Sequence, residues 1–342
     1  MQRPKRLLVM RLSAMGDVAM TVPVLLALRR TYPEVGIIAL SRKRFFPILH
    51  QIPGISLIEA DVNKRHSGVF GLRRLAMEIE KYQTDAIADL HNVLRTKTLR
   101  LFLKRIQSAK VSKGRKERKR LIKDPKFFEQ LKPIVHRYVD VVDELGLSVK
   151  LDSKDILPQL DIPQKVIDLM GDHKCRWVGV APFAAHRSKS LSVDKAKELI
   201  QSIEKIENIK VVLFGGGEQE SKQLELVAAA FDNVYSLAGI MTFEEELQMI
   251  SNLDAMIAMD SGNGHLAAMY GVPVITLWGN THPFAGFQPF MQSKENQITA
   301  SREQFPLIPT SIYGNKVPDG YENVMDSIDC DLVVERLLEV LN

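Results

Sequence analysis

Residues 253–278 read LDAMIAMDSGNGHLAAMYGVPVITLW, and this stretch decides the fold class. The apolar run from Leu253 to Met259 predicts a buried strand, and a second one follows from Val274 to Trp278. Between them, a turn rich in serine and glycine leads into small residues that predict a helix. A strand, a helix and a strand in this order form the βαβ unit of a parallel sheet, which is typical of α/β proteins.

The turn after the first of these strands is a candidate binding site. At Asp260, Ser261 and Gly262 the backbone N–H groups that open the helix are free, and the helix dipole is positive there, so the turn suits a phosphate. Open α/β sheets bind ligands at the carboxyl ends of their strands, where His265 also lies. An ordinary strand-to-helix turn, with Asp260 or Ser261 as the cap and His265 as a satisfied polar residue, fits the spacing equally well.

The size and composition of the chain indicate a globular protein with two domains. Its 342 residues exceed the size at which a single core usually stops growing. The net charge of +5 favours a polyanionic partner such as nucleic acid, anionic lipid or a phosphorylated glycan. Cys175 and Cys330 have no metal-type spacing and are interpreted as reduced thiols of a cytoplasmic protein. The sequence predicts neither a signal peptide nor a membrane span.

Short apolar runs alternate with helix-like segments on both sides of a looser stretch at residues 150–164. We place a linker there and predict an N-terminal domain over 1–160 and a C-terminal domain, with a terminal helix, over 161–342. Each half has its own series of βα units, so the simplest architecture is two Rossmann-like domains facing a central cleft. The basic run at 104–126 is interpreted as a solvated loop or helix face.

The first turn of the chain, from Arg11 to Asp17, is neither G-x-G-x-x-G nor a Walker A loop, which removes the main support for dinucleotide or P-loop chemistry. Asp17 lies at the carboxyl end of the first strand, where a carboxylate can accept a proton from a substrate hydroxyl. The alternative is a charge that only complements the dipole of the following helix.

Two further turns in the second half are candidate ligand contacts. Gly216 and Gly217 follow a strand and allow the backbone to approach a ligand, and Glu218 is placed to bind ribose hydroxyls. Lys189, in the loop 185–190, is placed to stabilise a diphosphate leaving group. Each turn also has a purely structural interpretation. The glycine turn can be a flexible turn that begins a helix, and the loop 185–190 can be a solvated basic loop.

Taken together, these residues resemble the lipopolysaccharide heptosyltransferases of glycosyltransferase family 9. The turn at 11–18 and the segment TVPVLLALR at 21–29 look like the opening motif of that family, and DLHNVLR at 89–95 looks like its mid-domain segment. The glycine-rich turn at 214–218 and the D-S-G-x-x-H-L-A-A motif at 260–268 complete the match.

The resemblance implies a GT-B fold and an inverting transfer of a sugar from a nucleotide diphosphate, without metal or cofactor. The expected donor is ADP-heptose, from which heptose is transferred. Asp17 would be the general base and Lys189 the diphosphate contact. Glu218, with Gly216 and Gly217, would face the ribose. The turn formed by Asp260, Ser261, Gly262 and His265 would hold the phosphates and the donor sugar.

The resemblance also implies an acidic glycolipid acceptor of the lipid A–Kdo type, bound in the N-terminal domain. The acceptor-binding residues would be Ser13, Gly16, Arg65, Asn92 and Arg95. Such a substrate places a cytoplasmic enzyme in peripheral contact with the inner face of the inner membrane.

Two other functions stay open at this point. One is a different GT-B nucleotide-sugar enzyme, such as an epimerase, a hydrolase or a transferase with a UDP or GDP donor. The sequence departs from the family pattern at Asn263-Gly264 and at 183–186, and these departures leave the identity of the sugar and of the nucleotide open. The other is a polyanion-binding protein without activity, although the basic run lacks the interleaved aromatic residues that nucleic-acid stacking needs. The D-x-D at 329–331 is interpreted as a helix cap, and no metal is expected.

Overall fold

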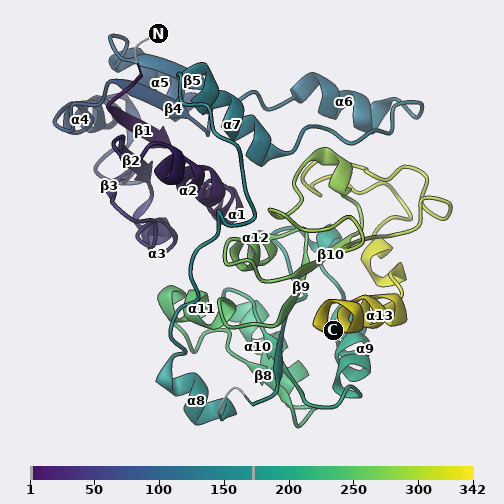
Figure 1. The fold of residues 1–342 in the computed structure, drawn as a ribbon. Helices are drawn as coiled ribbons and strands as arrows, with labels where there is room; N and C mark the ends of the chain where they lie inside the picture. The colour runs from purple at the N-terminus through teal and green to yellow at the C-terminus, as the bar shows by residue number, and fades with distance from the viewer. Residues whose placement is uncertain (1–2, 172–173) are drawn as a thin grey trace. The chain divides into compact units, whose positions relative to one another are not determined.

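The computed structural model describes residues 3–171 and 174–342, which form two compact units (Figure 1). The first unit comprises the described residues up to Lys113 together with Ile134–Leu157. The second comprises Gly114–Pro133 and the described residues from Pro158 to Asn342. Each unit is built around one parallel sheet.

The first unit has a five-stranded parallel sheet in the order β3-β2-β1-β4-β5. Helices α4 and α5 pack on the face of the sheet that presents Leu8, Ile38 and Ile87, while α7 contacts β4, β5 and α2. The elements are β1 (Arg6–Met10), α1 (Met15–Ala19), α2 (Val22–Thr31), β2 (Gly36–Ser41), η1 (Lys43–Phe45), α3 (Phe46–Leu49), β3 (Ile55–Glu59), α4 (Gly68–Glu80), β4 (Ala86–Asp89), α5 (Leu94–Phe102), β5 (Gln107–Lys110) and α7 (Ile134–Glu144).

The second unit has a six-stranded parallel sheet in the order β11-β10-β9-β6-β7-β8. Helices α9, α10 and α13 bury their apolar sides against one face, and α12 packs on β9 and β10. The elements are α6 (Arg115–Lys123), α8 (Gln164–Met170), β6 (Arg176–Ala181), η2 (Arg187–Lys189), α9 (Val193–Glu204), β7 (Ile209–Leu213), α10 (Glu218–Ala228), β8 (Val234–Ser236), α11 (Phe243–Ile250), β9 (Ala255–Met259), α12 (Gly262–Ala268), β10 (Val274–Trp278), η3 (Pro283–Ala285), β11 (Gln297–Thr299), η4 (Val324–Ser327) and α13 (Cys330–Leu341).

The prediction of two Rossmann-like α/β domains is confirmed. The chain passes from one unit to the other at Leu157–Pro158, whereas the sequence placed the boundary after residue 160. The segment 114–133 is a correction to the predicted domain 1–160, because it belongs to the second unit. Its Leu121 and Leu131 share a buried apolar cluster with Ala285 and Ile312.

Side chains cap the starts of two helices, and the cap predicted at 329–331 is confirmed. Thr242 Oγ1 accepts from the Glu245 amide at 3.3 Å, and the Glu245 carboxylate accepts from the Thr242 amide at 2.7 Å. Asp329 caps α13 by accepting from the Asp331 amide at 2.9 Å. Cys175 and Cys330 are not joined in a disulfide. Across the described residues, no helix combines the length and the apolar character needed to span a bilayer.

Candidate functional site

In the first unit, Asp17 lies in the turn between β1 and α1, at the carboxyl edge of the sheet. Its Oδ2 accepts from the Ala14 amide at 3.2 Å and forms an ion pair with the Arg11 guanidinium. Arg11 is itself fixed, because it donates to the Leu90 carbonyl at 2.7 Å and to the Tyr138 hydroxyl at 2.9 Å. These contacts hold the Asp17 carboxylate in one orientation. Its side chain stays 24% exposed, so it is open to a ligand.

His91 lies beside this turn, with Nε2 3.5 Å from the Ser13 hydroxyl. Burial, together with the cations Arg11 and Lys113, lowers the pKa of His91 to about 3. The imidazole is therefore neutral at physiological pH. Its Nδ1 is buried and has no hydrogen-bond partner among the described residues, as is also the case for Asn92 Oδ1. Unsatisfied buried polar atoms of this kind mark a place where a ligand completes the hydrogen bonding.

Basic side chains gather at the same edge. Burial lowers the pKa of Arg42, and the neighbouring cations Arg44 and Arg95 lower it further. Arg42 therefore lies among like charges, and its Nε is buried without a partner among the described residues. Together with Lys113 near His91, these side chains form a cation cluster that suits a carboxylate or phosphate.

The other predicted acceptor residues lie in different settings. Ser13 and Gly16 belong to the Asp17 turn, and Asn92 is held near it by a bond from Nδ2 to the Val111 carbonyl at 2.9 Å. Arg65 instead pairs with Glu78 at 3.5 Å and with Glu59 at 4.0 Å. Its charge is thus balanced by carboxylates within the unit, and in the described part of the chain no hydrogen bond or ion pair joins Arg65 to the Asp17 turn.

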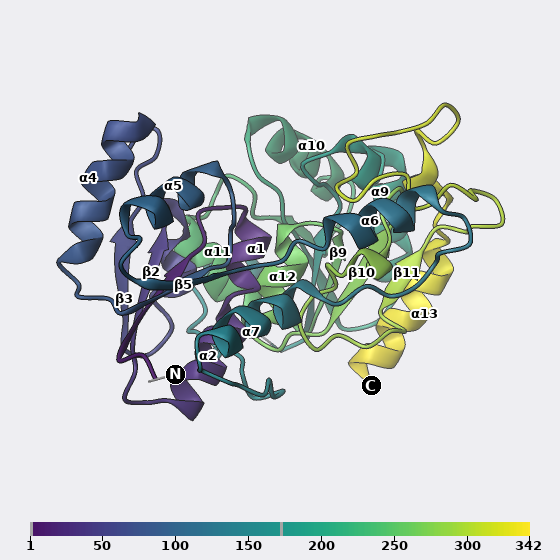
Figure 2. The same ribbon diagram turned by 90° about the horizontal axis from the view of Figure 1, so that it is seen from above.

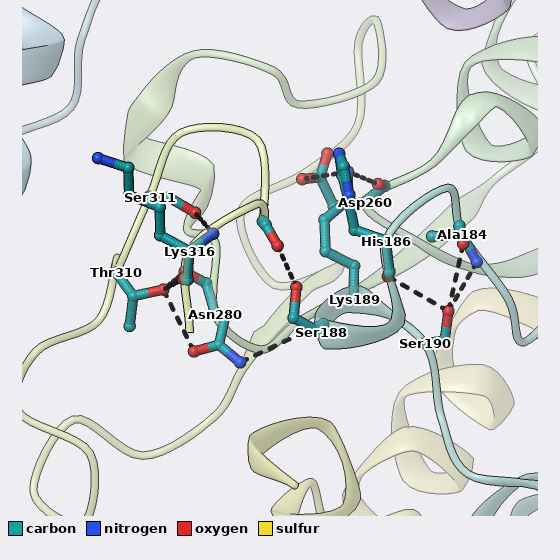
Figure 3. Close-up of polar contacts among 11 residues, drawn as sticks. Ala184, His186, Ser188, Lys189, Ser190, Asp260, Asn280, Thr310, Ser311 and Lys316 are labelled. Carbon is teal, nitrogen blue, oxygen red and sulfur yellow. Dashed lines mark hydrogen bonds and ion pairs between the residues drawn. The ribbon is translucent and has the colours of Figure 1, made fainter. Parts of the chain in front are cut away.

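In the second unit, Lys189 and Asp260 contact each other across 71 residues of sequence (Figure 3). The Lys189 Nζ donates to the Asp260 carbonyl at 2.7 Å and lies 3.3 Å from its Oδ2. Lys189 comes from the loop after β6, and Asp260 directly follows β9, the neighbouring strand. Both side chains are largely buried, at 13% and 12% exposure. Two of the predicted donor residues are therefore brought together at one edge of the sheet.

A loop that carries no sequence motif, residues 310–316, packs over this pair. The Ser188 hydroxyl donates to the Gly314 carbonyl, and Asn280 Nδ2 donates to the Ser188 carbonyl at 3.4 Å (Figure 3). Thr310 closes the loop by donating to the Lys316 carbonyl at 2.7 Å. A Cβ atom placed on Gly314 would lie only 2.6 Å from Lys189 Cγ. Gly314 is a further candidate site residue, and its one signal in the sequence is a glycine in a long loop.

The glycine turn lies at the carboxyl end of β7. The Gly216 amide donates to Glu220 Oε2 at 2.8 Å, and a Cβ on Gly216 or Gly217 would meet no atom within 4 Å. Glu218 is exposed and pairs with Lys222 at 2.7 Å. A cavity of about 440 Å³ lies between the β6 loop and α10. Its lining includes Phe183, Ala184, Arg187, Ser190, Leu191, Ser192, Val193, Gln219, Glu220 and Gln223. Glu220 is thus the carboxylate that faces both the glycine turn and the cavity, whereas Glu218 faces neither.

The remaining predicted donor residues open α12. Ser261 is the residue before its first turn, and its hydroxyl is buried without a hydrogen-bond partner among the described residues. Gly262 begins the helix, and His265 is buried in it. Gly264 lies close to β10, since a Cβ there would be 3.3 Å from Val274 Cγ1, so the helix start is packed tightly on the sheet.

The family model for glycosyltransferase family 9 (heptosyltransferase) matches residues 72–308, which is more than half of the chain. The chain belongs to this family. It is therefore a glycosyltransferase, and the resemblance predicted from its motifs is confirmed. Within the described residues, no group of three or more His, Cys, Asp or Glu side chains is arranged to hold a metal ion.

Two similar proteins illustrate the relationship. The chain is 27% identical to lipopolysaccharide heptosyltransferase 3 of Escherichia coli K12 over 94% of its length and 95% of that protein. It is 24% identical to the lipopolysaccharide core heptosyltransferase OpsX of Haemophilus influenzae over 82% of its length and 81% of that protein.

Solved structures of the family share the architecture. A family 9 glycosyltransferase from Veillonella parvula superposes with a TM-score of 0.76 at 19% identity, covering 98% of this chain and 97% of that one. The Escherichia coli heptosyltransferase WaaC, solved with ADP, gives a TM-score of 0.69 at 16% identity, covering 98% and 99%. At this identity the likeness shows the fold alone, and that fold is GT-B as predicted.

Proposed function

We propose that this family 9 enzyme transfers heptose from ADP-heptose to an acidic lipopolysaccharide-core acceptor of the lipid A–Kdo type, with inversion at the anomeric carbon. The names of its relatives support this choice of substrates, since they are lipopolysaccharide heptosyltransferases. The observation that carries the proposal is the oriented carboxylate of Asp17 beside the neutral His91 and the cation cluster.

Asp17 is the general base in this mechanism. Its two protein contacts use Oδ2, and we assign Oδ1 to the acceptor hydroxyl. As the hydroxyl oxygen attacks, a bond forms to the anomeric carbon and the bond from that carbon to the diphosphate oxygen breaks. The hydroxyl proton passes to Asp17, and the electron pair leaves with ADP. One direct displacement inverts the anomeric configuration.

Lys189 and the turn at Asp260–Gly262 meet the charge that develops on the diphosphate. The ammonium already lies in a largely buried position against Asp260, where a cation is worth more than in water. The glycine turn and the cavity beside Glu220 are proposed to take the nucleoside. Since Lys189 supplies the cation, the mechanism needs no metal, and transfer is expected to continue in EDTA.

The cation cluster of Arg42, Arg44, Arg95 and Lys113 is proposed to bind the carboxylates or phosphates of the acceptor. Of the residues predicted from sequence, Ser13, Gly16, Asn92 and Arg95 remain in this acceptor site. Arg65 remains a candidate only if the acceptor displaces it from its glutamates. A lipid-linked acceptor places the enzyme in peripheral contact with the inner face of the inner membrane.

The Asp17→Asn variant tests the proposal. We expect it to lose about 10²–10⁴-fold in transfer to a Kdo-bearing acceptor, as for removal of a general base, while ADP binding by calorimetry is unchanged. Asp61→Asn, which alters a carboxylate in the turn after β3 in the same unit, is the matched control. Retained turnover in Asp17→Asn contradicts the assigned role. Conversion of ADP-heptose without any acceptor would favour a hydrolase or epimerase instead.

A further inference from the structure

Helices α4 and α5 expose apolar side chains on their outer sides. Phe70 on α4 is 87% exposed and Leu94 on α5 is 80% exposed. The exposed apolar side chains of the two helices are Val69, Phe70, Met77, Leu94 and Leu101, and we call this surface the α4–α5 face. The helices contact each other and lie side by side in the first unit (Figure 2).

The core does not account for these side chains. Leu72, Leu75 and Ile79 of α4 and Leu99 of α5 already fill the inner sides of the helices against the sheet. An outer side that faces only water is expected to be polar. A group of exposed apolar residues on neighbouring helices marks an interaction surface.

Cations are interleaved with the apolar residues. The exposed basic side chains of these helices are Arg73, Arg74, Arg95 and Lys97, and Lys104 and Arg105 follow α5. On α5, Leu94, Lys97 and Leu101 share one side of the helix because they are spaced by three and four residues. Aromatic and aliphatic residues among lysines and arginines are typical of helices that lie in the surface of an anionic bilayer.

The position of the α4–α5 face relates it to the acceptor. Both helices begin beyond the carboxyl ends of strands, α4 after β3 and α5 after β4. Phe70 and Leu94 are in the first turns of their helices, so they lie at the edge of the sheet that carries Asp17 and His91. A membrane in contact with this face would hold a lipid-linked acceptor near the proposed general base.

We propose that the α4–α5 face docks on the surface of an anionic phospholipid bilayer, with Phe70 and Leu94 inserted among the lipids and the arginines and lysines on the headgroups. The inference rests on the proposed function only for its choice of a lipid surface. Helix α6 is a less suitable element, because it is strongly basic but its apolar Leu121 is buried in the second unit.

A tryptophan reporter tests the insertion. The native Trp177 and Trp278 are fully buried, so the emission of a Phe70→Trp variant that responds to lipid reports position 70. We expect a blue shift with vesicles of equimolar phosphatidylcholine and phosphatidylglycerol, and none with phosphatidylcholine alone. Leu226→Trp, at a 68% exposed position on α10 of the second unit, is the control and should not shift. An unshifted Phe70→Trp spectrum on anionic vesicles overturns the proposal.

A second variant measures the contribution to binding. Phe70→Ser/Leu94→Ser should weaken co-sedimentation with the anionic vesicles by about tenfold or more, because each apolar side chain buried in lipid contributes that order of affinity. Leu226→Ser should bind like the wild type. A concentration-dependent dimer that the double substitution abolishes would instead assign the face to a second copy of the chain and overturn the membrane proposal.

Activity separates this inference from the proposed function. With an acceptor that lacks its acyl chains, the double variant should retain wild-type turnover, whereas with acceptor embedded in the vesicles its turnover should fall with its vesicle binding. If the wild type transfers no heptose to either acceptor, the proposed function fails, and the vesicle measurements still decide the docking. Equal turnover of variant and wild type on embedded acceptor would overturn the docking alone.

Discussion

Gly314 gives the sharpest test of the donor site, because its lack of a side chain makes room for Lys189. In Gly314→Ala the new Cβ would lie 2.6 Å from Lys189 Cγ, 2.8 Å from Cδ and 3.1 Å from Ser188 Oγ. Carbon atoms in contact normally stay about 3.5–4.0 Å apart, so the lysine stem must move by about 1 Å. The bond from Nζ to the Asp260 carbonyl, now 2.7 Å, would not survive that shift.

A displacement of about 1 Å in a group that stabilises the leaving diphosphate costs on the order of 100-fold in turnover. Gly314 also has a φ of +77°, so an alanine there is strained by about 1–2 kcal/mol whatever it contacts. Gly320→Ala is the matched control, because Gly320 has a φ of +82° and a Cβ there would meet no atom within 4 Å. Both variants carry the strain of the positive φ, whereas only Gly314→Ala adds the clash with Lys189 and should lose turnover.

The assay is the initial rate of transfer at saturating donor and acceptor, with thermal unfolding measured on the same samples. The loss should also disappear in a Lys189→Ala background, where no stem remains to be displaced, so the two substitutions are strongly non-additive. Equal turnover of Gly314→Ala and Gly320→Ala would refute the reasoning. An undiminished effect of Gly314→Ala in the Lys189→Ala background would assign it to the loop and not to the lysine.

Two predictions concern stability. Burial lowers the pKa of His282 from 6.5 to about 4, so the unfolded chain binds a proton on His282 at a higher pH than the folded chain does. The free energy of unfolding therefore falls as the pH drops from about 6.5 to about 4. His282→Asn keeps an acceptor for the Phe284 amide and should lose about 3 kcal/mol less than the wild type between pH 7 and pH 4 in denaturant titrations. The centroid of the Phe128 ring lies 3.5 Å from Cζ of Arg302. Phe128→Ala removes this contact, so the attachment of 114–133 should weaken by about 2 kcal/mol and tryptic cleavage in the segment should accelerate. Phe127→Ala removes a ring that faces Arg120 of the same segment and leaves the Arg302 contact in place, so it should accelerate cleavage less, and equal rates for both variants would contradict this attachment.

The parallel core was predictable from sequence, and its edges were not. Central strands of a parallel sheet are covered on both faces, so they are continuous apolar runs such as Leu7–Met10 and Ala255–Met259. The edge strands β5, β8 and β11 give no such signal, because they have only three or four residues, and β5 reads QSAK. The segment after the first turn forms two helices divided near Thr21, because Pro23 fits only the first turn of a new helix.

The site divides in the same way. The positions of Asp17, Lys189 and Asp260 were predictable because each follows a core strand, and topology sends those ends to one edge of their sheet. The ion pairs were not predictable, because they depend on side-chain directions that spacing leaves undetermined. Two positions on α10 separate Glu218, which pairs with Lys222, from Glu220, which bonds the glycine turn. Side chains two positions apart on a helix point about 200° away from each other, so the sequence alone does not show which of the two carboxylates faces the glycine turn.

The segment 114–133 shows what a linear division into domains overlooks. The chain leaves the first unit after Lys113, packs Phe128 against His282 and Phe284 of the second, and returns at Ile134. With the passage at Leu157–Pro158 there are three covalent connections between the units instead of one. Lys113, which bears on the pKa of His91, is the last residue before one of them. A linear division at residue 160 therefore hides that a cation of the proposed acceptor site is the covalent neighbour of a segment that folds with the second unit.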